Sequence, residues 1–124
     1  NMIRVPACGS RIECRAADIS CNPYLGAALI LAAGLEGVRE QLDPGLPHRE
    51  NMYNYSDAEI AARNIQFLPQ SLEEAIDAFE ADPLSREVFG PRMFDAFVQF
   101  KRAEWRSYHN HVSDWEIRRY LKMF

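Results

Sequence analysis

Four charged side chains near the start of the chain have the types and spacing that chemistry requires: Arg4, Arg11, Glu13 and Arg15. Side chains alternate between the two faces of a strand, so the last three share one face if residues 11–17 form a strand. Arginine forks match the oxygens of phosphates and carboxylates, and a glutamate carboxylate is a ligand for hard divalent cations. Three arginines around one carboxylate therefore favour a site for a metal-bound polyanion.

The same residues have a simpler interpretation. An Arg–Glu–Arg alternation on an exposed hairpin forms a surface salt-bridge ladder, which contributes little to stability. However, residues 11–17 lead into the most apolar segment of the chain, residues 25–35, which predicts that the strand lies deep in a fold. Unpaired charges are costly there, and this favours the binding site. The alternative that stays open is a non-catalytic α-helical interaction module with a salt-bridged hairpin.

Turn and capping signals predict the elements that position these residues. Residues 2–6 and 11–17 are expected to form two short strands, joined by residues 7–10 as a hairpin. Asn22-Pro23 is typical of a helix start, because asparagine caps free N–H groups and proline is tolerated at the first helical position. This helix is expected to be buried and to run to about Leu42, before Asp43-Pro44-Gly45. Residues 43–70 are expected to be irregular, with a short helix over 56–64.

The sequence from Ser71 onward predicts helices. Ser71 to Glu74 and Ser113 to Glu116 are both capping boxes. Asp82-Pro83 starts a short helix that ends near Gly90, and Pro91 opens a long one. Steps of three and four predict one apolar stripe on the long helix and one inner face on the last helix. The stripe comprises Met93, Phe94, Phe97, Val98, Lys101, Trp105, Tyr108 and Val112, and the inner face Ile117, Tyr120, Leu121 and Phe124. Trp105 and Trp115 are expected in the core, as is Cys14. The fold class is α+β: a short antiparallel strand pair followed by several packed helices.

Composition excludes several classes of protein. The 124 residues and 14.3 kDa fit one domain, and 48% apolar with 26% charged residues is typical of a soluble globular protein. A net charge of −4 and a pI of about 5.4 argue against a nucleic-acid partner. Residues 25–35 are too short for a membrane span, which needs about 20 residues. The odd count of 3 cysteines indicates a reducing, cytoplasmic location.

The chain resembles the last part of glutamine synthetases. An "I-R-[IV]-P" strand of that family corresponds to residues 3–6, and its "R-I-E-x-R-x-x-D-x-x-x-N-P-Y-L" segment corresponds to residues 11–25. Further matches follow in the family order at Ala32, Gly34-Leu35, Pro44-Gly45, Asn51, Tyr53, Leu68-Pro69, residues 71–75, Phe97, residues 101–104, Glu116 and Tyr120. The resemblance covers essentially the whole chain.

This resemblance implies an ATP-dependent ligase. In the family, ATP phosphorylates the side-chain carboxylate of glutamate, and ammonia or a small amine displaces the phosphate. Divalent cations, Mg²⁺ or Mn²⁺, hold the phosphates during this reaction. By resemblance Glu13 ligates one cation, Arg4 and Arg11 contact ATP, and Arg15 is a catalytic residue that contacts the substrate glutamate and the transferring phosphoryl group. Tyr53 matches the place where some members are adenylylated, although a plain packed or surface tyrosine is the preferred interpretation.

The resemblance also implies how the chain is organised. Residues 1–124 would be a C-terminal segment of the catalytic domain: active-site strands over 1–21, a buried helix over 22–42, an irregular connection over 43–70 and a helical end over 71–124. The full-length protein would be a ring-shaped homo-oligomer, with no membrane or nucleic-acid partner. The chain alone is expected to be inactive, and the identity of the amine stays open.

Overall fold

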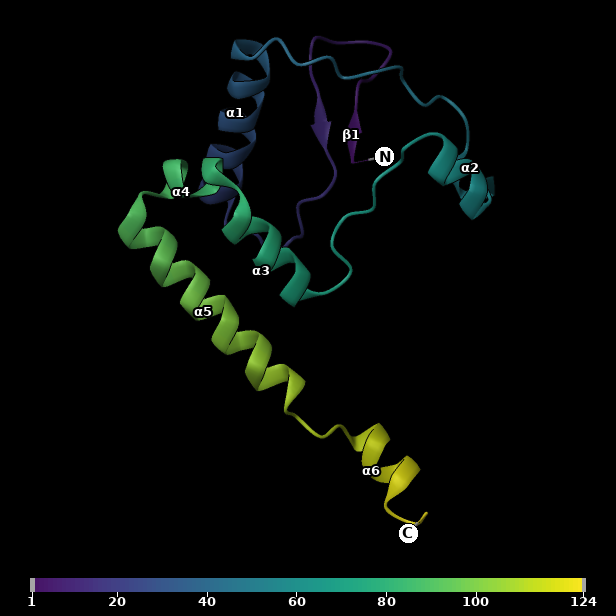
Figure 1. The fold of residues 1–124 in the computed structure, drawn as a ribbon, viewed down its shortest axis with the longest axis vertical. Coiled ribbons are helices and arrows are strands. Elements are labelled where there is room, and N and C mark those ends of the chain that lie inside the picture. Colours follow the sequence, from purple (N-terminus) through teal and green to yellow (C-terminus); the bar gives the residue numbers. More distant parts are fainter. Residues whose placement is uncertain (1, 124) are drawn as a thin grey trace. The chain divides into compact units, whose positions relative to one another are not determined.

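The computed structural model describes residues 2–123 and confirms the α+β class. The chain divides into two compact units, residues 1–54 and 55–124 (Figure 1). The first unit holds a strand pair and one long helix, and the second unit is helical. Within residues 2–123, no helix combines the length and the apolar character that crossing a membrane demands.

The strand pair is antiparallel, as predicted, but shorter than the sequence suggests. Strand β1 comprises Ile3–Arg4 and β2 comprises Glu13–Cys14, with Ile3 opposite Cys14 and Arg4 opposite Glu13. One further backbone hydrogen bond, from the Arg15 N–H to the Met2 carbonyl at 2.8 Å, extends the pairing. Pro6 has no N–H to donate, so regular pairing stops before it.

Helix α1, Pro23–Arg39, begins where the sequence predicts. The Asn22 side chain accepts hydrogen bonds from the backbone N–H groups of Tyr24 and Leu25 at 3.0 and 3.3 Å. The helix ends three residues earlier than expected, because Gln41 has a left-handed φ of 52°. The Leu42 N–H then turns back to the Gly37 carbonyl at 3.0 Å, which closes the helix as a Schellman motif.

The prediction that residues 22–42 form a buried helix concerns the whole domain, and within residues 2–123 this helix is uncovered. No residue of α1 is buried, and Leu31, Leu35 and Val38 are 64%, 54% and 77% exposed. The deep position predicted for the second strand also concerns the whole domain, and within residues 2–123 Glu13 and Cys14 are half-buried. An apolar helix is buried only where another layer covers it, and residues 2–54 form no such layer.

The irregular connection contains two short helical elements, η1 over Met52–Asn54 and α2 over Asp57–Ala62. Ser56 and Glu59 form a complete capping box at the start of α2. The helix predicted over 56–64 is therefore present and slightly shorter. It ends because Asn64 adopts a left-handed φ of 52°.

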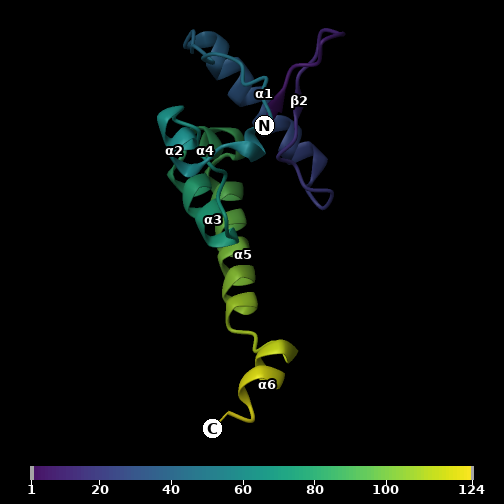
Figure 2. The ribbon, with the colours of Figure 1, turned by 90° about the vertical axis from the view of Figure 1, so that its right-hand side faces the viewer.

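The core of the second unit lies between α3, Leu72–Ala81, α4, Pro83–Phe89, and α5, Pro91–His109. Figure 2 shows α3 alongside the first part of α5. Three apolar residues are buried there, Ile76, Phe94 and Val98, and partly buried Leu72, Phe79, Phe89 and Trp105 pack around them. Four phenylalanine rings, Phe79, Phe89, Phe94 and Phe97, form a cluster with centroid distances of 5.2–5.4 Å.

The predicted starts of these helices hold, with one correction. Asp82 caps α4 through the Leu84 N–H at 2.9 Å, and α5 begins at Pro91. Ser71 accepts the Glu74 N–H at 3.1 Å, but the Glu74 carboxylate accepts from the Gln70 N–H at 2.8 Å instead of from Ser71. The first predicted box is therefore only half formed, because its carboxylate reaches one residue further back.

The end of the chain is more exposed than the sequence predicts. Helix α5 stops at His109, so Val112 lies outside it, and Met93 and Tyr108 on the predicted stripe are 44% and 74% exposed. Helix α6, Asp114–Tyr120, has the predicted capping box of Ser113 and Glu116.

The expected inner face of α6 is not covered, since Ile117, Tyr120 and Leu121 are 44%, 48% and 74% exposed. Phe124 lies outside the described residues. Trp115 is 60% exposed and therefore not in the core. Trp105 is partly buried and packs against the core, as predicted.

Candidate active site

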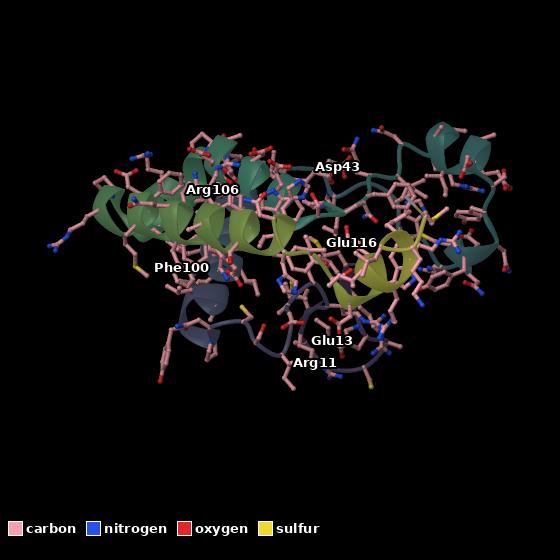
Figure 3. The ribbon with its side chains drawn as sticks, turned by 90° about the horizontal axis from the view of Figure 1, so that it is seen from below. Arg11, Glu13, Asp43, Phe100, Arg106 and Glu116 are labelled. Carbon is pink, nitrogen blue, oxygen red and sulfur yellow. The ribbon has the colours of Figure 1, made fainter. Side chains whose placement is uncertain are left out.

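The centre of the candidate site is the Glu13 carboxylate, which lies between two guanidinium groups. Arg4 stands directly across the strand pair, and its Nη1 donates to Glu13 Oε2 at 2.9 Å. Arg11 precedes Glu13 by two residues, so it lies on the same face, and its Nη2 donates to Glu13 Oε1 at 3.2 Å (Figure 3). Each carboxylate oxygen thus has one arginine partner.

Arg11 is held at a second point. Its Nη1 donates to the carbonyl of Cys8 at 3.4 Å, across the loop that joins the strands. The guanidinium therefore bridges the loop backbone and the carboxylate, with one nitrogen on each. This contact fixes the long side chain on the carboxylate face of the hairpin.

Arg15 completes the predicted face but makes a different set of contacts. Its backbone pairs with Met2, which keeps the alternation from Glu13 and turns its side chain to the Glu13 face. The residue is exposed, and within residues 2–123 its guanidinium has no ion pair. Of the three arginines at the site, Arg15 is thus the one whose guanidinium makes no ion pair with another side chain of residues 2–123.

A short turn connects the charged face to helix α1. The Asp18 carboxylate accepts hydrogen bonds from the hydroxyl and the backbone N–H of Ser20, the latter at 2.7 Å, and the Cys21 N–H donates to the Asp18 carbonyl at 3.0 Å. These bonds from Ser20, the hydroxyl first, lower the pKa of Asp18 below its ordinary value. The ionised aspartate therefore stabilises the turn, which passes directly into the Asn22 cap.

The balance of charge on this face favours an anionic ligand. Three guanidinium groups and one carboxylate leave an excess of positive charge. The two ion pairs lie at the surface, with Arg4 56% and Arg11 57% exposed, so they are weak and compete poorly with a polyphosphate. The geometry places guanidinium donors on both sides of one carboxylate.

Comparison with known proteins identifies the family. The family model described as "Glutamine synthetase, catalytic domain" matches residues 1–120. The chain belongs to the glutamine synthetase catalytic-domain family. The chain is 48% identical over 123 residues to a glutamate–methylamine ligase of Methyloversatilis universalis and 43% identical over 126 residues to a glutamine synthetase of Methanosarcina mazei. Each alignment covers 99% of the chain and 27% or 28% of the relative.

A solved structure supports the fold. The protein described as "Apo GmaS without ligand" superposes with a TM-score of 0.78 at 38% identity, over 98% of this chain and 27% of that one. The chain therefore spans about a quarter of the length of the glutamine synthetase relatives it matches.

The family implies a divalent cation, and Glu13 fits one as a single ligand. A carboxylate has about four lone-pair sites, so both oxygens retain acceptor capacity beside their arginine partners. Within residues 2–123 there is no group of three or more His, Cys, Asp or Glu side chains that could hold a metal ion. Since hard cations take about six oxygen ligands, Glu13 could contribute only one of several.

Tyr53, the candidate modification site of the glutamine synthetase family, lies in η1 and is 98% exposed. Its backbone N–H donates to Asn51 Oδ1 at 3.2 Å. Tyr53 is therefore a surface tyrosine and not a packed one. The structure brings Arg4, Arg11 and Glu13 into direct contact, whereas Tyr53 makes no bond to them.

Sequence reasoning missed one residue that lies against the candidate site, Gly9. It lies in the loop with a φ of +88°, directly beneath the Arg11 guanidinium. The available signal was a glycine within a four-residue hairpin loop, since such loops place glycine where a left-handed backbone is needed.

Proposed function

We propose that the complete protein is an ATP-dependent glutamate–ammonia or glutamate–amine ligase, and that this chain is the C-terminal segment of its catalytic domain. The match to the catalytic-domain family over residues 1–120 supports this proposal and disfavours a non-catalytic helical module. Residues 1–21 supply active-site strands, 22–42 a helix that the rest of the enzyme buries, 43–70 a connection and 71–124 the helical end. The whole enzyme is cytoplasmic and forms a homo-oligomeric ring.

The reaction has two steps. A γ-carboxylate oxygen of glutamate attacks the terminal phosphorus of ATP, which releases ADP and forms γ-glutamyl phosphate. The nitrogen of ammonia or an amine then attacks the acyl carbon, phosphate leaves with its bonding electrons, and the nitrogen loses a proton. Phosphoryl transfer is accelerated mainly by positioning and charge neutralisation, which arginines and cations provide.

The residues of this chain take distinct roles in these steps. Arg4 and Arg11 bind the phosphates of ATP, and their shared contact with Glu13 orients both forks before the nucleotide arrives. Glu13 contributes a carboxylate ligand to Mg²⁺ or Mn²⁺. When bound, the cation neutralises charge on the phosphates. Arg15, whose guanidinium makes no ion pair among the described residues, binds the glutamate carboxylate and the transferring phosphoryl group.

The observation that carries the proposal is the placement of Glu13 between two surface arginines, on the same face as a third that has no ion pair among the described residues. As a structural device this arrangement is weak, because exposed ion pairs contribute about 0–1 kcal/mol. As a binding device it is effective, because the guanidinium groups are pre-oriented on one face and are only lightly engaged.

The test is Glu13→Gln in the full-length enzyme, with phosphate release measured while the Mg²⁺ concentration is varied. The amide keeps the shape of the carboxylate but removes its charge, so we expect a large loss of kcat and a higher Mg²⁺ requirement. Glu87→Gln on the exposed face of α4 is the matched control and should behave as wild type. A Glu13→Gln enzyme with unchanged phosphate release and Mg²⁺ dependence would refute the metal role.

The acceptor is tested in the same assay with ammonia and with methylamine. The 48% identical relative is a glutamate–methylamine ligase, which makes methylamine the first alternative acceptor to compare. The isolated chain should release no phosphate, because its site offers a single metal carboxylate. Turnover by residues 1–124 alone would show that the chain is catalytically self-sufficient.

A further inference from the structure

Gly9 occupies a backbone position that few other residues adopt. Its φ of +88° lies in the left-handed half of conformational space, where a side chain collides with the neighbouring backbone. It lies in the loop between the strands, two residues before Arg11. The turn alone would favour a glycine here, and a second constraint acts on the same residue.

The second constraint is the Arg11 guanidinium, which occupies the space that a side chain at residue 9 would take. A Cβ built on Gly9 would lie 2.7 Å from Nη1 of Arg11 and 4.0 Å from its Cζ. The same Nη1 donates to the Cys8 carbonyl at 3.4 Å, while Nη2 donates to Glu13 at 3.2 Å. The guanidinium therefore packs on the bare Cα of Gly9 while it donates to the Cys8 carbonyl and to the Glu13 carboxylate.

Other left-handed glycines of the chain show that this close approach is not a general property of such turns. Gly45 has a φ of +74°, and no atom lies within 4 Å of the position its Cβ would take. Gly45 thus carries the backbone constraint alone, whereas Gly9 carries both constraints. Comparing Gly9 with Gly45 therefore separates the effect of backbone strain from the effect of the contact with Arg11.

The consequence of a larger residue at position 9 follows from which atom must move. The obstructing atom is the far end of a flexible side chain, so the clash is relieved when Arg11 swings away. That movement itself requires no change in the backbone, which meets only the strain of a side chain at this φ. The Cys8 and Glu13 contacts of Arg11 are lost, and a freed arginine has many rotamers to search before it meets a ligand.

We propose that Gly9 is a positioning residue for nucleotide binding: its missing side chain lets the loop seat the Arg11 guanidinium beside Glu13, ready for the phosphates of ATP. This inference rests on the proposed function for the role of Arg11. Gly9 itself does not contact the nucleotide. Its effect passes entirely through Arg11, and that dependence is what the experiment measures.

The experiment is a double-mutant cycle in the full-length enzyme with Gly9→Ala, Arg11→Ala and both together. The expected result for Gly9→Ala is a KM for ATP raised about tenfold, the effect of losing one hydrogen bond to a charged group, with a smaller change in kcat. The double variant should be no worse than Arg11→Ala, because the two substitutions remove the same interaction. Gly45→Ala is the matched control for backbone strain and should leave the KM for ATP unchanged.

A crystal structure of the Gly9→Ala enzyme provides the independent readout, with Gly9→Asn as a second variant because asparagine tolerates the left-handed backbone. The expected result is an Arg11 guanidinium displaced from the Cys8 carbonyl and from Glu13. The proposal is overturned if the guanidinium stays in place, or if Gly9→Ala and Arg11→Ala raise the KM for ATP independently and multiplicatively. If Arg11→Ala leaves that KM unchanged, the nucleotide role of Arg11 fails instead, and the crystal structure still decides whether Gly9 seats the guanidinium.

Discussion

Arg4 and Glu13 face each other across the antiparallel strand pair, with Arg4 Nη1 2.9 Å from Glu13 Oε2. Their side chains are 56% and 30% exposed, so water screens the attraction and the pair contributes about 0–1 kcal/mol to folding. The arginine is therefore oriented without being tightly engaged. That combination suits a ligand-binding arginine better than a structural one.

Arg4→Ala is expected to raise the KM for ATP about tenfold or more, because a charge-assisted hydrogen bond to phosphate is lost. The free energy of unfolding should change by less than about 1 kcal/mol, since the ion pair is exposed. Steady-state kinetics and urea denaturation measure the two quantities. Arg92→Ala, at an exposed position in α5, is the control. A stability loss without a change in KM would assign Arg4 a purely structural role.

Arg15→Ala is expected to lower kcat about a hundredfold, the usual effect of removing one donor from a developing anionic charge. Arg15→Lys should restore only part of the rate, because an ammonium group keeps the charge but not the two-pronged geometry. Because the proposed role includes the substrate carboxylate, the KM for glutamate should rise in both variants. Wild-type kcat and glutamate KM in Arg15→Ala would contradict the assignment.

Phe94→Ala is expected to destabilise the 55–124 unit by about 3–5 kcal/mol, because it opens a cavity in the core. Phe94 is 2% exposed and stacks on Phe79 with ring centroids 5.4 Å apart. Phe100→Ala on the same helix removes an equally large side chain that is 65% exposed, and it should change stability by less than about 1 kcal/mol. Denaturant unfolding compares the two, and equal losses would mean that the core lies elsewhere.

The Glu116 carboxylate should titrate below its ordinary pKa of 4.5, because it accepts hydrogen bonds from the Ser113 backbone N–H and hydroxyl. A folded-state pKa lowered in this way gives α6 a stabilisation that is full above pH 4.5 and is lost as the pH falls through the lowered value. Ser113→Ala removes the hydroxyl donor, so the pKa of Glu116 should rise toward its ordinary value. Carboxyl chemical shifts of the 14.3 kDa chain measure this directly, and an unchanged pKa in Ser113→Ala would argue against the capping box.

Local signals predicted the helix starts well, because capping depends on residues that are close in sequence. Asn22, Ser56 and Ser113 cap helices where the sequence places them. The helix ends were less predictable. Gln41 and Asn64 adopt left-handed conformations that close α1 and α2, and glutamine gives little warning of that conformation.

Burial was the weakest part of the sequence prediction. The apolar residues of α1 and α6 have the pattern of core positions, but Leu31 and Leu121 are 64% and 74% exposed. Burial depends on two surfaces, and a pattern on one helix specifies only one of them. In α5 the partner surface is present in α3 and α4, and there Phe94 and Val98 are buried as predicted.

The sequence by itself determined which side chains of the candidate site share a face, because alternation along a strand is a property of the backbone. It also determined the family, through the order and spacing of its motifs. Only the tertiary structure decided which guanidinium reaches which oxygen: the register sets Arg4 opposite Glu13, and the loop seats Arg11 over Gly9. Pairing across strands and close approach to a bare Cα both depend on how the chain turns back on itself, which local sequence patterns do not specify.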